Sequence, residues 1–343
     1  MKKVVAAVWC VVLLSCVIVA VVVLRRDCSC DSEKAGVVES AKTTKAEELK
    51  QPAPVSEDPA LIPNDAMPPI AEKTVPKVLP SKPSRHIRIP VELSAVPQTM
   101  LRVAGEQDGN NYFARSKAMR TLGKKLLIEE VSLLYILMNR RASDDPLPAD
   151  QLNALKNEAA DLLLEQKIIP SDLANNLMAM YSNKKHDVVW RDYCIQHLGS
   201  ICGELANGLE KNAVIQTMWE AADETKTSIA GTALISLTRN SGDGGIRKER
   251  IAKKALGFVE DANCGESARI TALQICAKLG EKSMLPTARE IANGKDSVPL
   301  RMSAIAAIGT LGDESDLPIL EKNASSSDIR LRTAAKAALK RLR

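Results

Sequence analysis

Apolar residues in the second half of the chain recur at the spacing of buried helix faces, and the same pattern returns several times. A basic residue is followed by Ala three positions later, by an aliphatic residue or Cys at seven and by Leu at ten. Clear copies begin at Arg269, Arg301 and Arg332, and looser copies begin at Arg191 and Thr227. The intervals between the copies are 36, 42, 32 and 31 residues. A period in this range predicts a solenoid of helix pairs.

Each copy is expected to supply a first helix that carries the register and a second, plainer helix. The second helices are expected over residues 212–220, 248–260, 285–293 and 317–322. Ahead of the copies, apolar periodicity predicts a long helix over about 112–140 and two more over about 149–166 and 171–182. These three do not match the register and are expected to form an irregular cap. Because the apolar positions are mostly Ala, Leu, Ile and Val and the aromatic content is only 3%, the fold class is expected to be all-α.

The first 26 residues are expected to be a membrane segment. Positions 4–24 are uncharged and mostly aliphatic, with two Lys before them and two Arg after. As a helix this run would span about 30 Å, enough to cross the hydrocarbon core of a bilayer. The alternative is a bacterial lipoprotein signal, because Leu13-Leu14-Ser15-Cys16 resembles a lipobox and would make Cys16 the lipidated residue. Both interpretations place the protein at a membrane, and the flanking charges favour an extracytoplasmic bulk, periplasmic in a bacterium.

A Pro-rich linker is expected between the membrane segment and the helices. Residues 52–97 hold 11 of the 17 prolines, and residues 27–110 show no periodicity. Such a composition cannot bury enough apolar area to offset the entropy of ordering, so this segment is expected to be disordered. The predicted domains are the anchor over 1–26, the linker over 27–110, the irregular helical cap over 111–185 and the repeats over 186–343.

Two copies of the register end alike. Leu279-Gly280-Glu281 and Leu311-Gly312-Asp313 follow the last apolar position, with Gly placed to end the helix in the left-handed conformation. On these residues, positions 187–343 resemble HEAT repeats, particularly the short class first described in phycobilisome lyases, whose Arg, Ala, Leu and Leu-Gly-Asp pattern is matched from Arg301 to Asp313. The resemblance implies an α-solenoid. Such repeats occur in scaffolds, transport factors and a few enzymes.

The expected function is that of a membrane-tethered scaffold that binds a protein partner and has no enzymatic activity. Trp190, Tyr193 and Trp219 are candidate partner-binding residues because aromatic side chains often anchor interfaces, and core filling is the alternative role. Two other functions stay open: an accessory, lyase-like protein that handles a small-molecule ligand, and a polyanion-binding protein that uses its basic C-terminal helix. The polyanion candidates on that helix are Arg330, Lys336, Lys340, Arg341 and Arg343. The net charge of +5 is concentrated there, so nucleic acid is not expected as a partner of the whole chain.

The sequence contains no set of residues with the spacing of a catalytic, cofactor or metal site, and none is expected. Cys194 and His197 share a helix face, but no second Cys/His pair has ligand spacing. The iron-binding hydroxylases built from related repeats use His-Glu dipeptides, and none of the three histidines here precedes Glu. The repeated arginines are expected to form a structural ladder with carboxylates near the helix ends. These carboxylates are Glu281, Asp296, Asp313 and Asp328.

Overall fold

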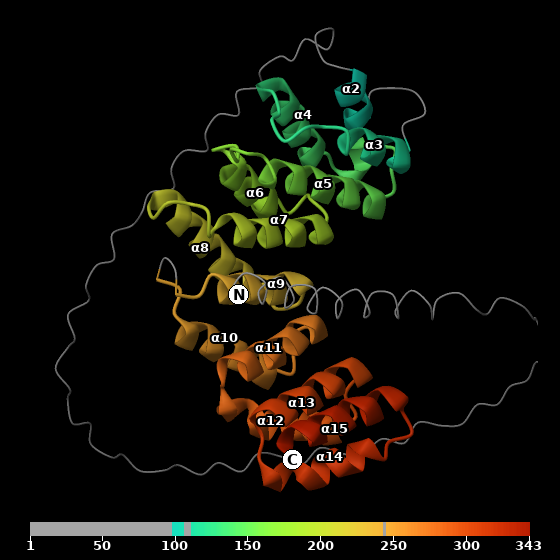
Figure 1. The fold of residues 1–343 in the computed structure, drawn as a ribbon, viewed down its shortest axis with the longest axis vertical. Coiled ribbons are helices and arrows are strands. Elements are labelled where there is room, and N and C mark those ends of the chain that lie inside the picture. Colours follow the sequence, from blue (N-terminus) through green and yellow to red (C-terminus); the bar gives the residue numbers. More distant parts are fainter. Residues whose placement is uncertain (1–97, 106–110, 243–244) are drawn as a thin grey trace, which may run out of the picture. The chain divides into compact units, whose positions relative to one another are not determined.

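The computed structural model describes residues 98–343, except 106–110 and 243–244, within the compact unit Ser84–Arg343. The predicted membrane segment, Cys16 and most of the predicted linker lie outside the described residues. The α-helices are α2 (Gln98–Ala104), α3 (Tyr112–Met119), α4 (Ile128–Asn139), α5 (Ala149–Leu164), α6 (Leu173–Ser182), α7 (Val188–Ile201), α8 (Leu209–Ala221), α9 (Ser228–Arg239), α10 (Lys248–Glu260), α11 (Glu266–Leu279), α12 (Leu285–Asn293), α13 (Val298–Leu311), α14 (Leu317–Ala324) and α15 (Ile329–Leu342). Short 3-10 helices are η2 (Ala142–Asp144), η3 (Lys282–Met284) and η4 (Glu314–Asp316). The all-α prediction is confirmed for this part of the chain, which contains no strand (Figure 1).

The helices pack as pairs, and the helix that carries the register comes second in each pair. α10 packs along α11, α12 along α13 and α14 along α15 (Figure 1). In contrast, α11 and α13 make little contact with the α-helix that follows them. The expected bounds of the plainer helices agree closely with the structure, but the expected order within a pair is wrong.

The register arginines explain this order, because each one binds the C-terminal end of the helix before it or, for Arg332, the turn that follows that helix. Arg301 donates from Nε and Nη2 to the carbonyl oxygen of Ala292 at the end of α12, both at 3.2 Å. The equivalent donor and acceptor pairs are Arg191 to Tyr181 (2.7 Å), Arg269 to Val259 (3.3 Å) and Arg332 to Ser326 (2.6 Å). Carbonyls at a helix C-terminus lack intrahelical hydrogen-bond donors and carry the negative end of the helix dipole. A guanidinium supplies both the missing donors and a compensating positive charge. The repeated basic residue is therefore a clamp within each pair.

The expected ladder of arginines and carboxylates is present only in part. Arg269 lies 3.8 Å from Asp296 in the turn before α13, whereas Arg301 binds the amide oxygen of Asn323 at 3.1 Å. The other carboxylates accept from the backbone N–H two residues further on. These are Glu281, Asp313 and Asp328. Because a short acidic side chain close to a helix start readily caps its own backbone, these three serve the turns rather than the arginines.

Successive register helices stack on one another and form what we call the register row: α3, α5, α7, α9, α11, α13 and α15. The helices of this row approach closely at glycines, which have no Cβ atom. A Cβ at Gly309 of α13 would lie 2.5 Å from the Cβ of Ala338 on α15, and a Cβ at Gly199 of α7 would lie 2.3 Å from the hydroxyl of Ser236 on α9. Real Cβ atoms do not approach other atoms so closely, so glycine sets the distance between these helices.

The two glycines expected to end helices differ from each other. Gly280 has a φ of 79°, the left-handed conformation that was predicted. Gly312 has a φ of −69°, so the prediction is wrong there. Its Cβ would lie 2.4 Å from a carboxylate oxygen of Asp316, which is buried and ion-paired with Arg289. Space rather than backbone conformation therefore requires glycine at this position.

The helices ahead of the repeats follow the same pairing, with α2 against α3 and α4 against α5. The long helix predicted over 112–140 is broken into α3 and α4 at the turn around Gly123. Buried Arg115 of α3 donates to the carbonyls of Val103 and Ala104 at the end of α2, as the register arginines do. The helices over 111–185 therefore share the pairing of the repeats, and the irregular cap stays a prediction, as does the point at which the repeats begin. The linker prediction is wrong for α2, which falls inside the predicted range of 27–110. This segment is helical because its apolar side chains are buried against α3 and α4.

Candidate partner-binding groove

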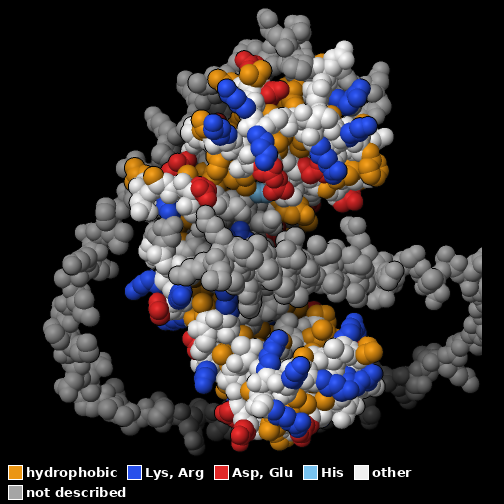
Figure 2. Space-filling view, in the orientation of Figure 1, with side chains coloured by type: hydrophobic (Ala, Val, Ile, Leu, Met, Phe, Trp, Pro, Cys, Tyr) orange, Lys and Arg blue, Asp and Glu red, His pale blue; other side chains and the backbone are white. Residues whose placement is uncertain are grey.

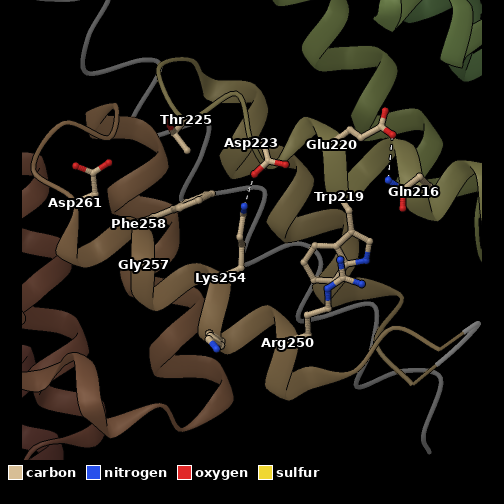
Figure 3. Close-up of a pocket in the computed structure, with 11 residues that line it drawn as sticks. Gln216, Trp219, Glu220, Asp223, Thr225, Arg250, Lys254, Gly257, Phe258 and Asp261 are labelled. Atoms are coloured by element: carbon tan, nitrogen blue, oxygen red, sulfur yellow. Dashed lines mark hydrogen bonds and ion pairs between the residues drawn. The ribbon is translucent and has the colours of Figure 1, made fainter. Parts of the chain in front are cut away.

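A groove of about 550 Å³ opens between α8 and α10 (Figure 3). We call the first helices of the pairs, α2 to α14, the second row. In this row α10 packs on α12 and α12 on α14, but α8 and α10 do not pack closely on each other. The groove occupies the space that this gap leaves, with walls from the C-terminal half of α8, the middle of α10 and the loops that follow them.

The groove coincides with the longest interval in the repeat pattern. The 42-residue interval separates register positions 227 and 269, and position 227 holds Thr where the other copies have Arg. The Thr227 hydroxyl accepts from the N–H of Ile229 and donates to the carbonyl of Glu224, so it caps α9 and does not clamp the end of α8. The longest interval therefore falls beside the helix, α10, that stands away from α8.

The loops after α8 and α10 bind each other at one end of the groove. The N–H of Gly265 donates to the carbonyl of Thr225 at 2.7 Å. A Cβ on Gly265 would lie 2.9 Å from the same oxygen, so glycine is needed for this approach. Lys226 adds a hydrogen bond from its ammonium to the carbonyl of Asn263. This end is therefore fixed, and the rest of the groove is open along the helices.

Apolar rings form the base of the groove, and charged groups cover them. Trp219 and Phe258 are only 7% and 5% exposed. The guanidinium of Arg250 stacks over the Trp219 ring with its carbon 4.0 Å from the ring centroid, and Figure 3 shows it lying across the indole. Lys254 forms an ion pair with Asp223 across the groove. Because Arg250 is solvent-exposed, its side chain can move and uncover the indole without unfolding any helix.

The charge on the α8 wall is negative, and the charge on the α10 wall is mostly positive, with Asp261 in the loop after α10 as the exception. Arg250, Lys253 and Lys254 follow one face of α10, whereas Glu220 and Asp223 lie on α8 and the loop after it. Gln216 donates to Glu220 at 3.0 Å, which holds that carboxylate at the rim. Lys253 is exposed and has no ion-pair partner among the described residues. An extended segment with mixed charge and an apolar side chain would find complementary groups on both sides.

The three aromatic residues predicted to bind a partner do not gather in one place. Trp219 lines the groove, Tyr193 is half-buried on α7, and Trp190 is fully buried. The Trp190 ring stacks under the ammonium of Lys156 at 5.3 Å, and its Nε1 has no hydrogen-bond partner. Of the three, only Trp219 is therefore placed where a ligand in the groove can reach it.

Outside the groove, burial shifts the pKa of several groups on or beside α5 and α7 towards the neutral form. It lowers the pKa of His186 and of His197 to about 4, and it lowers the pKa of Lys156 to about 8. Burial also raises the pKa of the Cys194 thiol far above its usual range. A neutral thiol and a neutral imidazole enclosed in the core do not form a reactive pair. Among the described residues, no group of three or more His, Cys, Asp or Glu is arranged to hold a metal ion.

The polyanion candidates lie on α15 at the end of the register row. Arg330 is ion-paired with Asp328 at 2.9 Å, and Arg343 with Glu321 at 2.8 Å. The remaining three candidates are exposed and have no ion-pair partner in the part of the chain that the structure describes. These are Lys336, Lys340 and Arg341.

Sequence reasoning missed the α10 wall of the groove. Arg250, Lys253 and Phe258 lie on a helix that the register marked only as the plainer member of its pair. The sequence shows the long interval and the Thr at position 227. It does not show that α8 and α10 lie apart at this point of the second row.

Comparisons with known proteins agree with the helical repeats. The HEAT repeat family matches residues 259–340. No curated protein matches the sequence. Among solved structures, human deoxyhypusine hydroxylase in complex with glycerol is 13% identical, over 71% of this chain and 97% of that chain, with a TM-score of 0.31. Nothing about function follows from so low a score. Within the described residues, each helix is too short or too polar to cross a membrane.

Proposed function

Because residues 259–340 are HEAT repeats, we propose that this chain is a membrane-tethered scaffold that binds a segment of a partner protein in the groove between α8 and α10. The observation that carries the proposal is the gap in the second row, lined by two aromatic rings and by walls of opposite charge. Grooves of this kind suit a peptide, since apolar pockets supply affinity and flanking charges fix its direction.

The size of the groove favours a narrow ligand over a broad protein surface. At about 550 Å³ it holds a few side chains of an extended segment. The Trp219 ring under Arg250 is the strongest candidate anchor, because buried Trp and Arg residues dominate the energy of many interfaces. We propose that the chain acts by binding and not by catalysis. The tether rests on positions 4–24 of the sequence.

Site-specific cross-linking in cells tests the proposal. A photoreactive amino acid at Lys253, exposed on α10 in the groove, should capture a discrete partner. The same amino acid at Gln274, exposed on α11 and outside the groove, is the matched control. Trp219→Ala should weaken capture from Lys253 by about thirtyfold, the effect typical of a hot-spot residue. Equal capture from both positions, or capture that Trp219→Ala leaves unchanged, would exclude this groove.

A further inference from the structure

The two final register helices form a surface of one charge sign. α13 and α15 together contain no Asp or Glu, while α15 alone carries six Lys and Arg residues counting the terminal Arg343. Figure 2 shows Lys and Arg side chains gathered over this end of the register row. The arginines of the register clamp are used inside the fold, but Lys336 and Lys340 project side by side from a face of α15 that no described helix covers. Arg341 is also exposed and lies about 100° further round the helix.

This basic face has an electrostatic cost that the fold itself does not relieve. Lys336 and Lys340 are four residues apart on one helix face, where like charges repel. No carboxylate among the described residues forms an ion pair with either of them. An anionic surface laid along this face would relieve the repulsion and gain attraction from both lysines.

We propose that the outer face of α15 binds the anionic headgroups of a lipid bilayer. Beyond its cations the helix offers no polar group to a ligand: its only uncharged polar side chain, Thr333, donates its hydroxyl to the carbonyl of Ile329. Exposed cations along one helix are sufficient to bind anionic lipid headgroups, because this binding requires only positive charge near the membrane surface. The preference for lipid over another polyanion rests on the proposed membrane tether, which would keep α15 close to a bilayer.

Lysine acetylation of the full-length chain tests the proposal. The chain is combined with phosphatidylcholine vesicles that contain or lack phosphatidylglycerol, and modification by a water-soluble reagent is followed by mass spectrometry. With phosphatidylglycerol, Lys336 and Lys340 should react about fivefold more slowly, the effect expected for a basic side chain at an anionic surface. High salt should remove the protection. Lys253 in the groove, also exposed, should react at the same rate with both vesicles.

A pair of charge-matched variants separates binding by this face from non-specific attraction. Lys336→Glu with Arg341→Glu should abolish the protection at Lys340. Lys124→Glu with Lys125→Glu, which makes the same charge change at exposed positions before α4, should leave it intact. Equal reaction rates with both vesicles would overturn the proposal. So would protection of Lys340 by duplex DNA or by a co-purified protein in the absence of any lipid effect. The proposal shares the membrane tether with the proposed function, but because the assay uses neither the groove nor a partner, its result is independent of binding in the groove.

Discussion

Replacing Gly309 by Ala tests the packing of the register row with the smallest possible change. The new Cβ would lie 2.5 Å from the Cβ and 2.6 Å from the Cα of Ala338, whereas carbon atoms in contact normally stand about 3.5–4.0 Å apart. α13 and α15 would have to separate by about 1 Å. Overpacking of this kind costs about 1–3 kcal/mol, and the better helix propensity of Ala returns up to about 1 kcal/mol. A net loss of about 1–2 kcal/mol is expected.

A second glycine provides the matched control. Gly257 lies in α10, and a Cβ there would meet no atom within 4 Å. Gly257→Ala should therefore keep the gain in helix propensity without the clash and raise stability by up to about 1 kcal/mol. Adding Ala338→Gly to Gly309→Ala should recover part of the loss, because it removes one of the two clashing carbons.

Urea unfolding of the unit Ser84–Arg343 measures these changes, and amide hydrogen exchange of α15 shows whether the last pair opens separately, as it can in repeat proteins. The reasoning would be refuted if Gly309→Ala were as stable as Gly257→Ala and left exchange in α15 unchanged. α13 and α15 would then not be held at the distance that the structure shows.

Three further predictions concern charge and the membrane. Burial lowers the pKa of His197 to about 4, while an unfolded His titrates near 6.5, so protonation favours the unfolded chain and about 2 kcal/mol of stability should be lost between pH 7 and pH 5. His197→Gln should reduce this loss in urea titrations at the two pH values; an unaltered loss would show that His197 is not its source. Burial lowers the pKa of Lys156 to about 8, so the free energy of unfolding should rise between pH 8 and about pH 10.5, the value for an unfolded Lys. Lys156→Met should abolish that rise, and a rise that persists in the variant would show that Lys156 is not its source. The full-length chain should stay with membranes after a carbonate wash, whereas a chain beginning at Ser84 should be released; release of both would rule out a membrane-spanning anchor.

The sequence was sufficient to predict the helices of the repeats, because the register and its period are local patterns, but it missed α2 and joined α3 to α4. The plainer helices over 248–260 and 285–293 have the bounds that were expected. The order within each pair could not be predicted, because the pattern does not show that Arg301 reaches back to Ala292 rather than forward. That choice depends on where the chain turns in space.

The candidate site was less accessible to sequence reasoning for a related reason. A groove arises from the distance between α8 and α10, which are separated by 26 residues in the chain and do not pack closely on each other. Trp219 was identified as an aromatic residue of the correct type, but its stacking partner Arg250 was not. Trp190 is the same type of residue as Trp219, but it is enclosed in the core. Residue type alone did not separate the two.

The affinity of the partner captured from the groove tests the central claim most directly. The binding constant is measured for the wild-type chain, for Lys253→Glu in the groove and for Lys340→Glu on α15, which makes the same charge change on a different exposed surface. We expect Lys253→Glu to weaken binding at least about tenfold, as is typical of reversing a charge at an interface, and Lys340→Glu to leave it within about twofold. Unchanged affinity for Lys253→Glu, or a loss confined to Lys340→Glu, would show that the partner does not bind between α8 and α10.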